Sequence, residues 1–159
     1  MTDIIINTKT GEKGDYADWV RAFDEIWAGG AQNLDRFMTL LSRDVLLIAP
    51  GLQPTKGEDA GHKMLKQSFE IFPDLTGSVK RWGANGNTLF IEMDFAATIG
   101  GKRMVWGNVD RIVFSQGYAV ERRAYFDPTT VRSALLKSPS GLIKMIRLRM
   151  TMQPRGDLA

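Results

Sequence analysis

The period of the hydrophobic residues changes near the middle of this 159-residue chain. Up to about residue 72 the apolar residues recur at intervals of three and four, which is the spacing of an amphipathic helix. From about residue 77 apolar and polar residues alternate, as they do in half-buried strands. The change of period predicts a helical first half followed by a sheet.

Three helices are expected in the first half. The first covers about residues 15–29, with Asp15 as its cap and Gly29-Gly30 at its end. The second follows Asn33 as its cap, and a short buried strand, DVLLIAP, comes after it. The third covers about residues 57–71, because Pro73 prevents the helix from continuing. The first helix has a strongly aromatic face, made of Tyr16, Trp19, Val20, Phe23 and Trp27.

Turn signals divide the second half into four strands. They are Asn85-Gly86, Gly100-Gly101 and the segment 115–117. The expected strands cover about residues 78–82, 88–99, 103–114 and 118–126. Helices followed by a meander predict an α+β domain, in which the helices pack on one face of a curved antiparallel sheet of four to six strands.

The length of the chain favours one domain. We expect an N-terminal extension at residues 1–14, the domain at 15–137 and a basic tail at 138–159. The secondary structure of the tail stays open, because GLIKMIRL suits a helix whereas residues 146–152 alternate as a strand does. Pro128 ends the last strand, and Asp127 is expected to cap or turn the helix that follows rather than to catalyse.

The net charge of +3 is unevenly distributed. Residues 1–127 hold 15 Lys/Arg against 17 Asp/Glu, whereas the rest holds 6 basic residues against Asp157 alone. The basic excess therefore belongs to the tail. A basic rim of Lys102, Arg103 and Arg111 lacks the interleaved aromatic residues of a nucleic-acid site, so no nucleic-acid partner is expected.

The chain has no cysteine and one histidine, His62. Disulfides, thiolate metal sites and multi-histidine sites within the chain are therefore excluded, and only a carboxylate site for Mg or Ca stays open. We expect no metal and no organic cofactor, and we interpret His62 as a surface residue. The start of the chain lacks the features of a secretory signal, and no window has the apolar length of a membrane span. These features favour a cytoplasmic protein with no membrane partner.

The order of the elements resembles the cone-shaped fold of nuclear transport factor 2 (NTF2) and, within it, the SnoaL-like polyketide cyclase branch. The resemblance covers about residues 16–135 and rests on FDEIWAGGAQNLDRFMTLLSRDV, GEDAGHKMLKQSFEIFPDL and RRAYFD. It implies a conical pocket between the concave face of the sheet and the first helix. Members of this superfamily include cyclases, isomerases, hydrolases, transport factors and non-catalytic binders, so the fold does not by itself identify the function.

The resemblance to limonene epoxide hydrolase can be followed position by position. The catalytic aspartate of that family falls on Ala124, its arginine and aspartate pair on Glu92 and Asp94, and its water-positioning tyrosine and asparagine on Leu47 and Ala49. Three of these five positions lack a polar side chain. Epoxide hydrolysis by that route is therefore not expected.

The ketosteroid isomerases give a second comparison. Their proton-shuttling aspartate falls on Ala49, next to Pro50, and their oxyanion-hole tyrosine falls near Phe23. Only their second oxyanion-hole residue is kept, as Asp110. A neutral carboxylic acid can donate to an oxyanion, but this cycle also needs a base.

Alternation along the strands, combined with the resemblance, selects the candidate pocket residues. The expected catalytic residues are Asp94, as the acid/base group of a SnoaL-like cyclase, and Arg122, which keeps Asp94 ionised or binds an enolate oxygen. A structural ion pair between the two residues is the alternative. The expected substrate-binding residues are Trp19, Phe23, Glu92, Trp106, Asn108, Asp110 and Phe126.

Three functions stay open. The first is a cofactor-independent cyclase, isomerase or hydratase for an apolar oxygenated molecule such as a polyketide or terpenoid. The second is a binding protein with the same pocket, and the third is an interaction module that uses the sheet face or the tail. A homodimer is expected to form through the face of the sheet opposite the pocket, as is common in the family. That face is expected to carry Ile91, Met93, Phe95, Val105, Val109 and Val113, with Arg111 among them.

Overall fold

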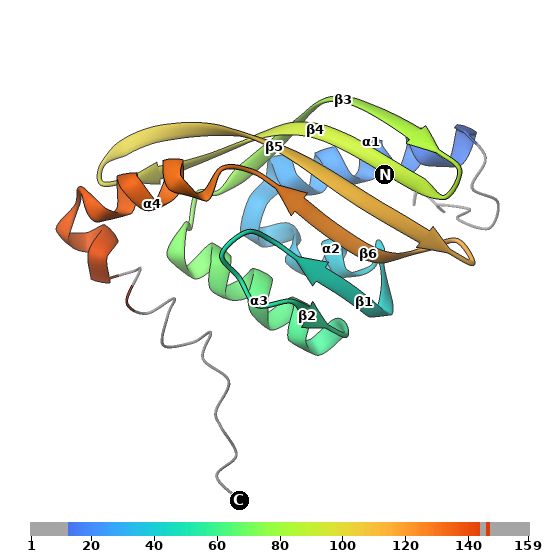
Figure 1. The fold of residues 1–159 in the computed structure, drawn as a ribbon, viewed down its shortest axis with the longest axis horizontal. Helices are drawn as coiled ribbons and strands as arrows, with labels where there is room; N and C mark the ends of the chain where they lie inside the picture. Colours follow the sequence, from blue (N-terminus) through green and yellow to red (C-terminus); the bar gives the residue numbers. More distant parts are fainter. Residues whose placement is uncertain (1–12, 144–145, 147–159) are drawn as a thin grey trace, which may run out of the picture.

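The computed structural model describes residues 13–143 and residue 146. The helices are α1 (Lys13–Gly29), the 3-10 helix η1 (Gly30–Asn33), α2 (Leu34–Met38), α3 (Glu58–Ile71) and α4 (Pro128–Leu136). The strands are β1 (Leu41–Ile48), β2 (Thr55–Lys56), β3 (Thr76–Asn85), β4 (Thr88–Ile99), β5 (Lys102–Ser115) and β6 (Tyr118–Tyr125). Figure 1 shows α1, α2 and α3 on one side of a curved sheet, with α4 beyond one end of the strands. The predicted α+β architecture is confirmed.

The six strands form one sheet in the order β2-β1-β6-β5-β4-β3. The pairs from β3 to β6 are antiparallel, as a meander predicts. Strand β1, however, pairs in parallel with β6, with Leu47 opposite Arg122. The expected antiparallel meander is therefore present, and one parallel pair makes the six-stranded sheet mixed. Parallel pairing is possible here because α3 and the four strands β2 to β5 lie between β1 and β6 and provide the long connection that it requires.

The aromatic face of α1 forms the centre of the core. Trp19 and Phe23 are at most 1% exposed, and Trp27 lies edge-on to Phe95 of β4 at 4.8 Å between ring centroids. Helix α1 can approach β3 because residue 77 is a glycine, where a Cβ would lie 3.0 Å from Trp27 Cβ. This close contact sets the face of the sheet on which the core lies.

The two caps expected in the first half have other roles. Helix α1 begins at Lys13, so Asp15 lies inside the helix instead of before it. Asn33 does stand at the N-cap position of α2, but its side chain makes no capping hydrogen bond there. Its Nδ2 donates to the carbonyl oxygen of Ile26 at 3.3 Å, so it ties α2 to the end of α1.

The cap expected at Asp127 is confirmed. The Asp127 carboxylate accepts hydrogen bonds from the Thr129 amide at 2.8 Å and from the Thr129 hydroxyl at 2.7 Å, at the start of α4. Residues 139–143 and residue 146 are also helical. The predicted N-terminal extension and most of the predicted tail lie outside the described residues.

Candidate functional site

Strand β4 presents its apolar residues to the helices. Ile91 and Met93 are fully buried, and Ile91 pairs with the equally buried Asp110 of β5. Since directly paired residues share a face, the alternate residues Glu92 and Asp94 lie on the outer face, away from the helices. The prediction that Glu92 and Asp94 face the pocket was therefore wrong.

Both carboxylates pair with cations of the neighbouring strand β3. Asp94 Oδ2 lies 2.7 Å from Lys80 Nζ, and Glu92 Oε1 accepts a hydrogen bond from Arg81 Nη2 at 3.0 Å. The hydrogen bond from the Arg81 side chain lowers the pKa of Glu92. Asp94 and Arg122 therefore lie on opposite faces of the sheet. The aromatic face of α1 packs against the apolar side of β4, so the charged side chains of β4 point outward.

Arg122 belongs instead to a buried polar cluster on the inner face of β5 and β6. Its Nε donates to Asp110 Oδ2 at 2.8 Å, and its Nη2 lies 2.7 Å from the same oxygen. Asn108 Nδ2 donates to the other oxygen, Asp110 Oδ1, at 3.0 Å. Asp110 is 0% exposed, Asn108 2% and Arg122 7%. The positive charge of Arg122 is thus balanced inside the protein, and its guanidinium is held in one orientation.

Aromatic rings surround the same guanidinium. Arg122 Cζ lies 5.2 Å from the ring centroid of Trp27, 5.6 Å from that of Phe37 and 5.8 Å from that of Phe23. The negative faces of aromatic rings attract a cation, and the attraction strengthens as water is removed. Ion pair and rings together stabilise a cation that would be costly to bury alone.

A cavity of about 620 Å³ opens beside this cluster. Its floor is the inner face of the sheet, and its walls come from α3, from the loop after β1, from the segment after β6 and from α4. Within the described part of the chain, the lining residues other than Arg122, Arg132, Gln53 and Ser68 are apolar or glycine. The lining consists of Trp27, Ala49, Pro50, Gly51, Leu52, Gln53, Met64, Leu65, Ser68, Ile71, Phe72, Leu75, Phe95, Trp106, Arg122, Ala124, Phe126, Pro128, Val131, Arg132, Leu135 and Leu136.

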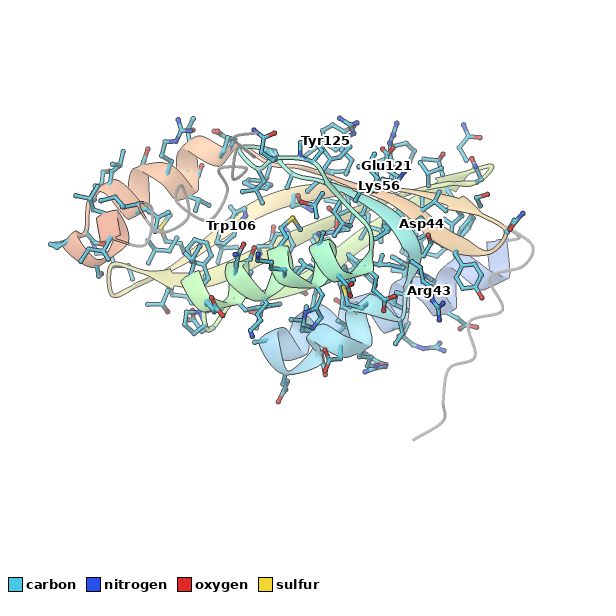
Figure 2. All side chains as sticks on the ribbon, turned by 90° about the horizontal axis from the view of Figure 1, so that it is seen from below. Arg43, Asp44, Lys56, Trp106, Glu121 and Tyr125 are labelled. Carbon is cyan, nitrogen blue, oxygen red and sulfur yellow. The ribbon has the colours of Figure 1, made fainter. Side chains whose placement is uncertain are left out.

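Three of the residues expected at the pocket line this cavity: Trp106, Arg122 and Phe126. Figure 2 shows Trp106 on the helix side of the sheet, whereas Glu121 and Tyr125 lie on the opposite side. Alternation along β5 and β6 therefore assigned the inner face of these two strands correctly.

The other expected residues lie away from the cavity surface. Asn108 and Asp110 are behind Arg122 and contact it or each other, as described above. Trp19 and Phe23 fill the core instead, where Trp19 Nε1 donates to the carbonyl oxygen of Leu40 at 3.4 Å. Their positions on α1 face the middle of the sheet, and only Trp27, one turn beyond Phe23, reaches the cavity.

The wall formed by α4 was not identified from the sequence. It contributes Val131 and Leu135, which are four residues apart and so lie on one face of the helix. The available signal was this spacing after the Asp127 cap. Nothing in this spacing indicates that the helix lines the cavity.

Two buried polar atoms near Arg122 have no hydrogen-bond partner among the described residues. They are Trp27 Nε1 and Asn108 Oδ1. Buried polar atoms without partners are uncommon in folded proteins and often interact with water or a ligand. Trp27 Nε1 can donate one hydrogen bond and Asn108 Oδ1 can accept one, in a region where most side chains are apolar.

Residues 13–143 and 146 contain no group of three or more His, Cys, Asp or Glu side chains that could hold a metal ion. Within the same residues, no helix has the length and apolar character needed to cross a membrane.

A family model described as the SnoaL-like domain matches residues 18–122. No curated protein matches the chain. Among solved structures, a protein described as a SnoaL-like polyketide cyclase from Jannaschia sp. CCS1 superposes with a TM-score of 0.66 and 19% identity, over 84% of this chain and 96% of that one.

Two further solved structures are similar in fold. An epoxide hydrolase from M. tuberculosis, similar to limonene epoxide hydrolase, has a TM-score of 0.58 and 22% identity, over 80% of this chain and 92% of that one. A protein from Catenulispora acidiphila with a ketosteroid isomerase-like fold, in complex with trimethylamine, has a TM-score of 0.65 and 13% identity, over 77% and 94%. At these identities the similarity establishes the NTF2-like cone fold and not a shared reaction.

Proposed function

Because this chain belongs to the SnoaL-like family, we propose that it binds a small, largely apolar, oxygen-bearing molecule in the cavity and acts on it as a cofactor-independent cyclase or isomerase. The size and apolar lining of the cavity support binding, since sites for small molecules are mostly apolar with a few fixed polar groups. Arg122 is the fixed polar group in this proposal.

The buried Arg122 and Asp110 pair is the observation that carries the proposal. Arg122 lines the cavity, and Asp110, which does not, holds its guanidinium at 2.7–2.8 Å. Donors that are already oriented in a water-poor site stabilise a developing negative charge strongly, because no solvent has to reorganise. Arg122 is therefore suited to the oxygen of a carbonyl group that becomes an enolate.

In the proposed reaction the substrate supplies its own nucleophile. A carbon next to a carbonyl group loses a proton to solvent and becomes an enolate. The enolate carbon attacks a second carbonyl carbon of the same molecule, one C–C bond forms, and the π electrons of that carbonyl move to its oxygen. This oxygen then takes a proton back from solvent. The cavity brings the two reacting ends together, and Arg122 stabilises the enolate oxygen. Asp94 has no part in this proposal because it pairs with Lys80 on the outer face.

A non-catalytic ligand-binding protein is the second candidate. The titratable side chains among the described lining residues are Arg122 and Arg132, and arginine keeps its proton at neutral pH. Ala49 and Ala124 also line the cavity, at positions where the enzymes that the sequence resembles carry polar catalytic residues. Such a protein would hold the same ligand without converting it.

Binding of 2-acetylnaphthalene, an apolar ketone, tests the proposed role of Arg122 by isothermal titration calorimetry. We expect Arg122→Met to weaken binding about tenfold, since a hydrogen bond to a charged group contributes about 1.5–3 kcal/mol. Arg123→Met is the matched control, because Arg123 is the next residue of β6 and points to the outer face. It should leave the affinity unchanged.

A second variant covers the case in which Arg122→Met fails to fold, because that change leaves Asp110 buried without a cation. The double variant Arg122→Met/Asp110→Asn removes both charges and should bind the ketone as weakly as the single variant. Unchanged affinity in a folded double variant would contradict the proposal.

A second experiment distinguishes an enzyme from a binding protein. If the protein accelerates the cyclisation of 2,6-heptanedione, followed by NMR, the result favours the enzyme. Ketone binding without acceleration favours the second candidate.

We also propose a homodimer through the outer face of the sheet. The exposed apolar side chains of this face are Phe90, Val105, Val109 and Tyr125, at 43%, 59%, 37% and 48% exposure. Of the residues expected on this face, Ile91, Met93 and Phe95 are instead buried under the helices. Exposed apolar side chains gathered on one face favour a partner, and a symmetric dimer would cover them in both copies.

A further inference from the structure

The charge on the cavity lining is not balanced. Among the described residues that line it, the charged side chains are Arg122 and Arg132, and Asp110 neutralises the first from behind. Arg132, on α4, is exposed, and no described side chain forms an ion pair or a hydrogen bond with it. The lining therefore carries about one uncompensated positive charge, in a body whose residues 1–127 are slightly acidic overall.

An uncompensated charge at an apolar cleft acts on the ligand more strongly than the same charge on an open surface. Apolar walls have a low dielectric constant and concentrate the field inside the cleft, which raises the local concentration of ions of opposite charge. The apolar neighbours of Arg132 on α4, such as Val131 and Leu135, also line the cavity. A ligand that fills the cavity would thus lie next to this guanidinium.

We infer that the ligand is a monocarboxylic acid whose carboxylate pairs with Arg132 while its apolar, oxygen-bearing body lies against Arg122. This inference rests on the proposed function and specifies its substrate class. One arginine matches one carboxylate, which it can bind through two parallel hydrogen bonds. A phosphate, with a charge of about −1.5 to −2, would need a second cation that the described lining does not provide.

Two probes of nearly equal shape separate charge from fit. 2-Naphthoate carries the carboxylate, and 2-naphthamide is its neutral counterpart. We expect the unmodified protein to bind 2-naphthoate more tightly, and Arg132→Gln to weaken 2-naphthoate about fivefold, in the range of an ion pair that water still reaches. The affinity for 2-naphthamide should change less than about twofold. The preference for 2-naphthoate should also decrease as salt is raised, because salt screens an exposed pair.

Lys137→Gln is the matched control. Lys137 follows α4, is exposed and does not line the cavity, so the variant loses the same charge without changing the lining. It should leave both probes unaffected. An equal loss for 2-naphthoate in the Lys137 variant would show a general effect of charge and overturn the assignment of Arg132.

The outcomes for the two proposals can be told apart. If 2-acetylnaphthalene binds in an Arg122-dependent way but Arg132→Gln changes both naphthalene probes equally, the carboxylate inference is wrong and the proposed function stands. If none of the three probes binds, the proposed function is wrong, and the carboxylate inference with it.

Discussion

Arg122 lies in an environment that tolerates a charge only because of its neighbours. Asp110 accepts from it, Asn108 holds the second oxygen of Asp110, and aromatic rings cover the guanidinium. Removing one member of such a buried pair leaves the other without compensation, which costs more than the pair contributes as a whole. The ion pair is thus better understood as a device that keeps Arg122 in place than as a source of stability.

Asp110→Asn should lower the free energy of unfolding by about 3–5 kcal/mol, because it leaves Arg122 buried and unpaired. Urea denaturation measures this loss. Asp94→Asn is the matched control on the neighbouring strand: its ion pair with Lys80 is partly exposed, so it should cost at most about 1 kcal/mol. Adding Arg122→Met to Asp110→Asn should recover part of the loss. Equal effects of the two Asp→Asn changes would contradict this view of the cluster.

Alternation predicted the inner face of β5 and β6 but not that of β4. It identifies the residues that share a face without saying which face is buried. On β5 the resemblance selected the face that carries Trp106 and Asp110, and that face is the inner one. On β4 both sets contain apolar residues, such as Phe90 and Ile91, and the resemblance to enzymes with catalytic carboxylates favoured the wrong one.

Helix α4 depends on the Asp127 cap and contributes one wall of the cavity. The hydrogen bonds from the Thr129 side chain and amide lower the pKa of Asp127 below its ordinary value of 3.8. A carboxylate with a lowered pKa stabilises the folded state fully above pH 3.8. It loses that contribution as the pH falls through the lowered pKa.

We therefore expect α4 to lose helicity below about pH 4, at a pH where the sheet itself is still folded. The Cα chemical shifts of α4 between pH 6 and pH 2.5 measure this change. Asp127→Asn is the matched control, because an asparagine caps a helix equally well and does not titrate in this range. Identical shifts in the two proteins across the range would show that the cap does not control α4.

Two other features, strand β2 and the parallel pairing of β1 with β6, could not be predicted from the sequence. Strand β2 has only Thr55–Lys56, which is too short for any alternation to be visible. The parallel pairing of β1 with β6 depends on the path of the whole chain and leaves no local pattern. The meander, in contrast, was predicted because each of its turns has a glycine signal close to the strands it joins.

At the scale of the whole molecule, the outer face of the sheet combines apolar residues with charged residues that form ion pairs. Glu121 pairs with both Arg111 and Arg123, and Lys80 pairs with Asp94. Pairing within the face reduces the repulsion between like charges when the face meets a copy of itself. These ion pairs support the proposed dimer together with the exposed apolar side chains.

Light scattering at micromolar concentration should give twice the chain mass of 17.8 kDa. Val109→Lys should reduce the mass to that of one chain, because it places a charge in the centre of the proposed contact. Ala60→Lys adds the same charge to the exposed side of α3, on the helix side of the molecule, and should leave the dimer intact. A mass of one chain for the unmodified protein would contradict the dimer.

The parallel pairing of β1 with β6 also determines the order in which the molecule can fold. Its partners, such as Leu47 and Arg122, lie far apart in the sequence, whereas the meander forms from neighbouring hairpins. Contacts over such a separation form late, because the chain must lose the entropy of a long loop before they can stabilise it. During synthesis, the edge of β1 that pairs with β6 has no partner strand until β6 has been made. The last strand therefore completes the sheet and delivers Arg122 to the cavity in the same step.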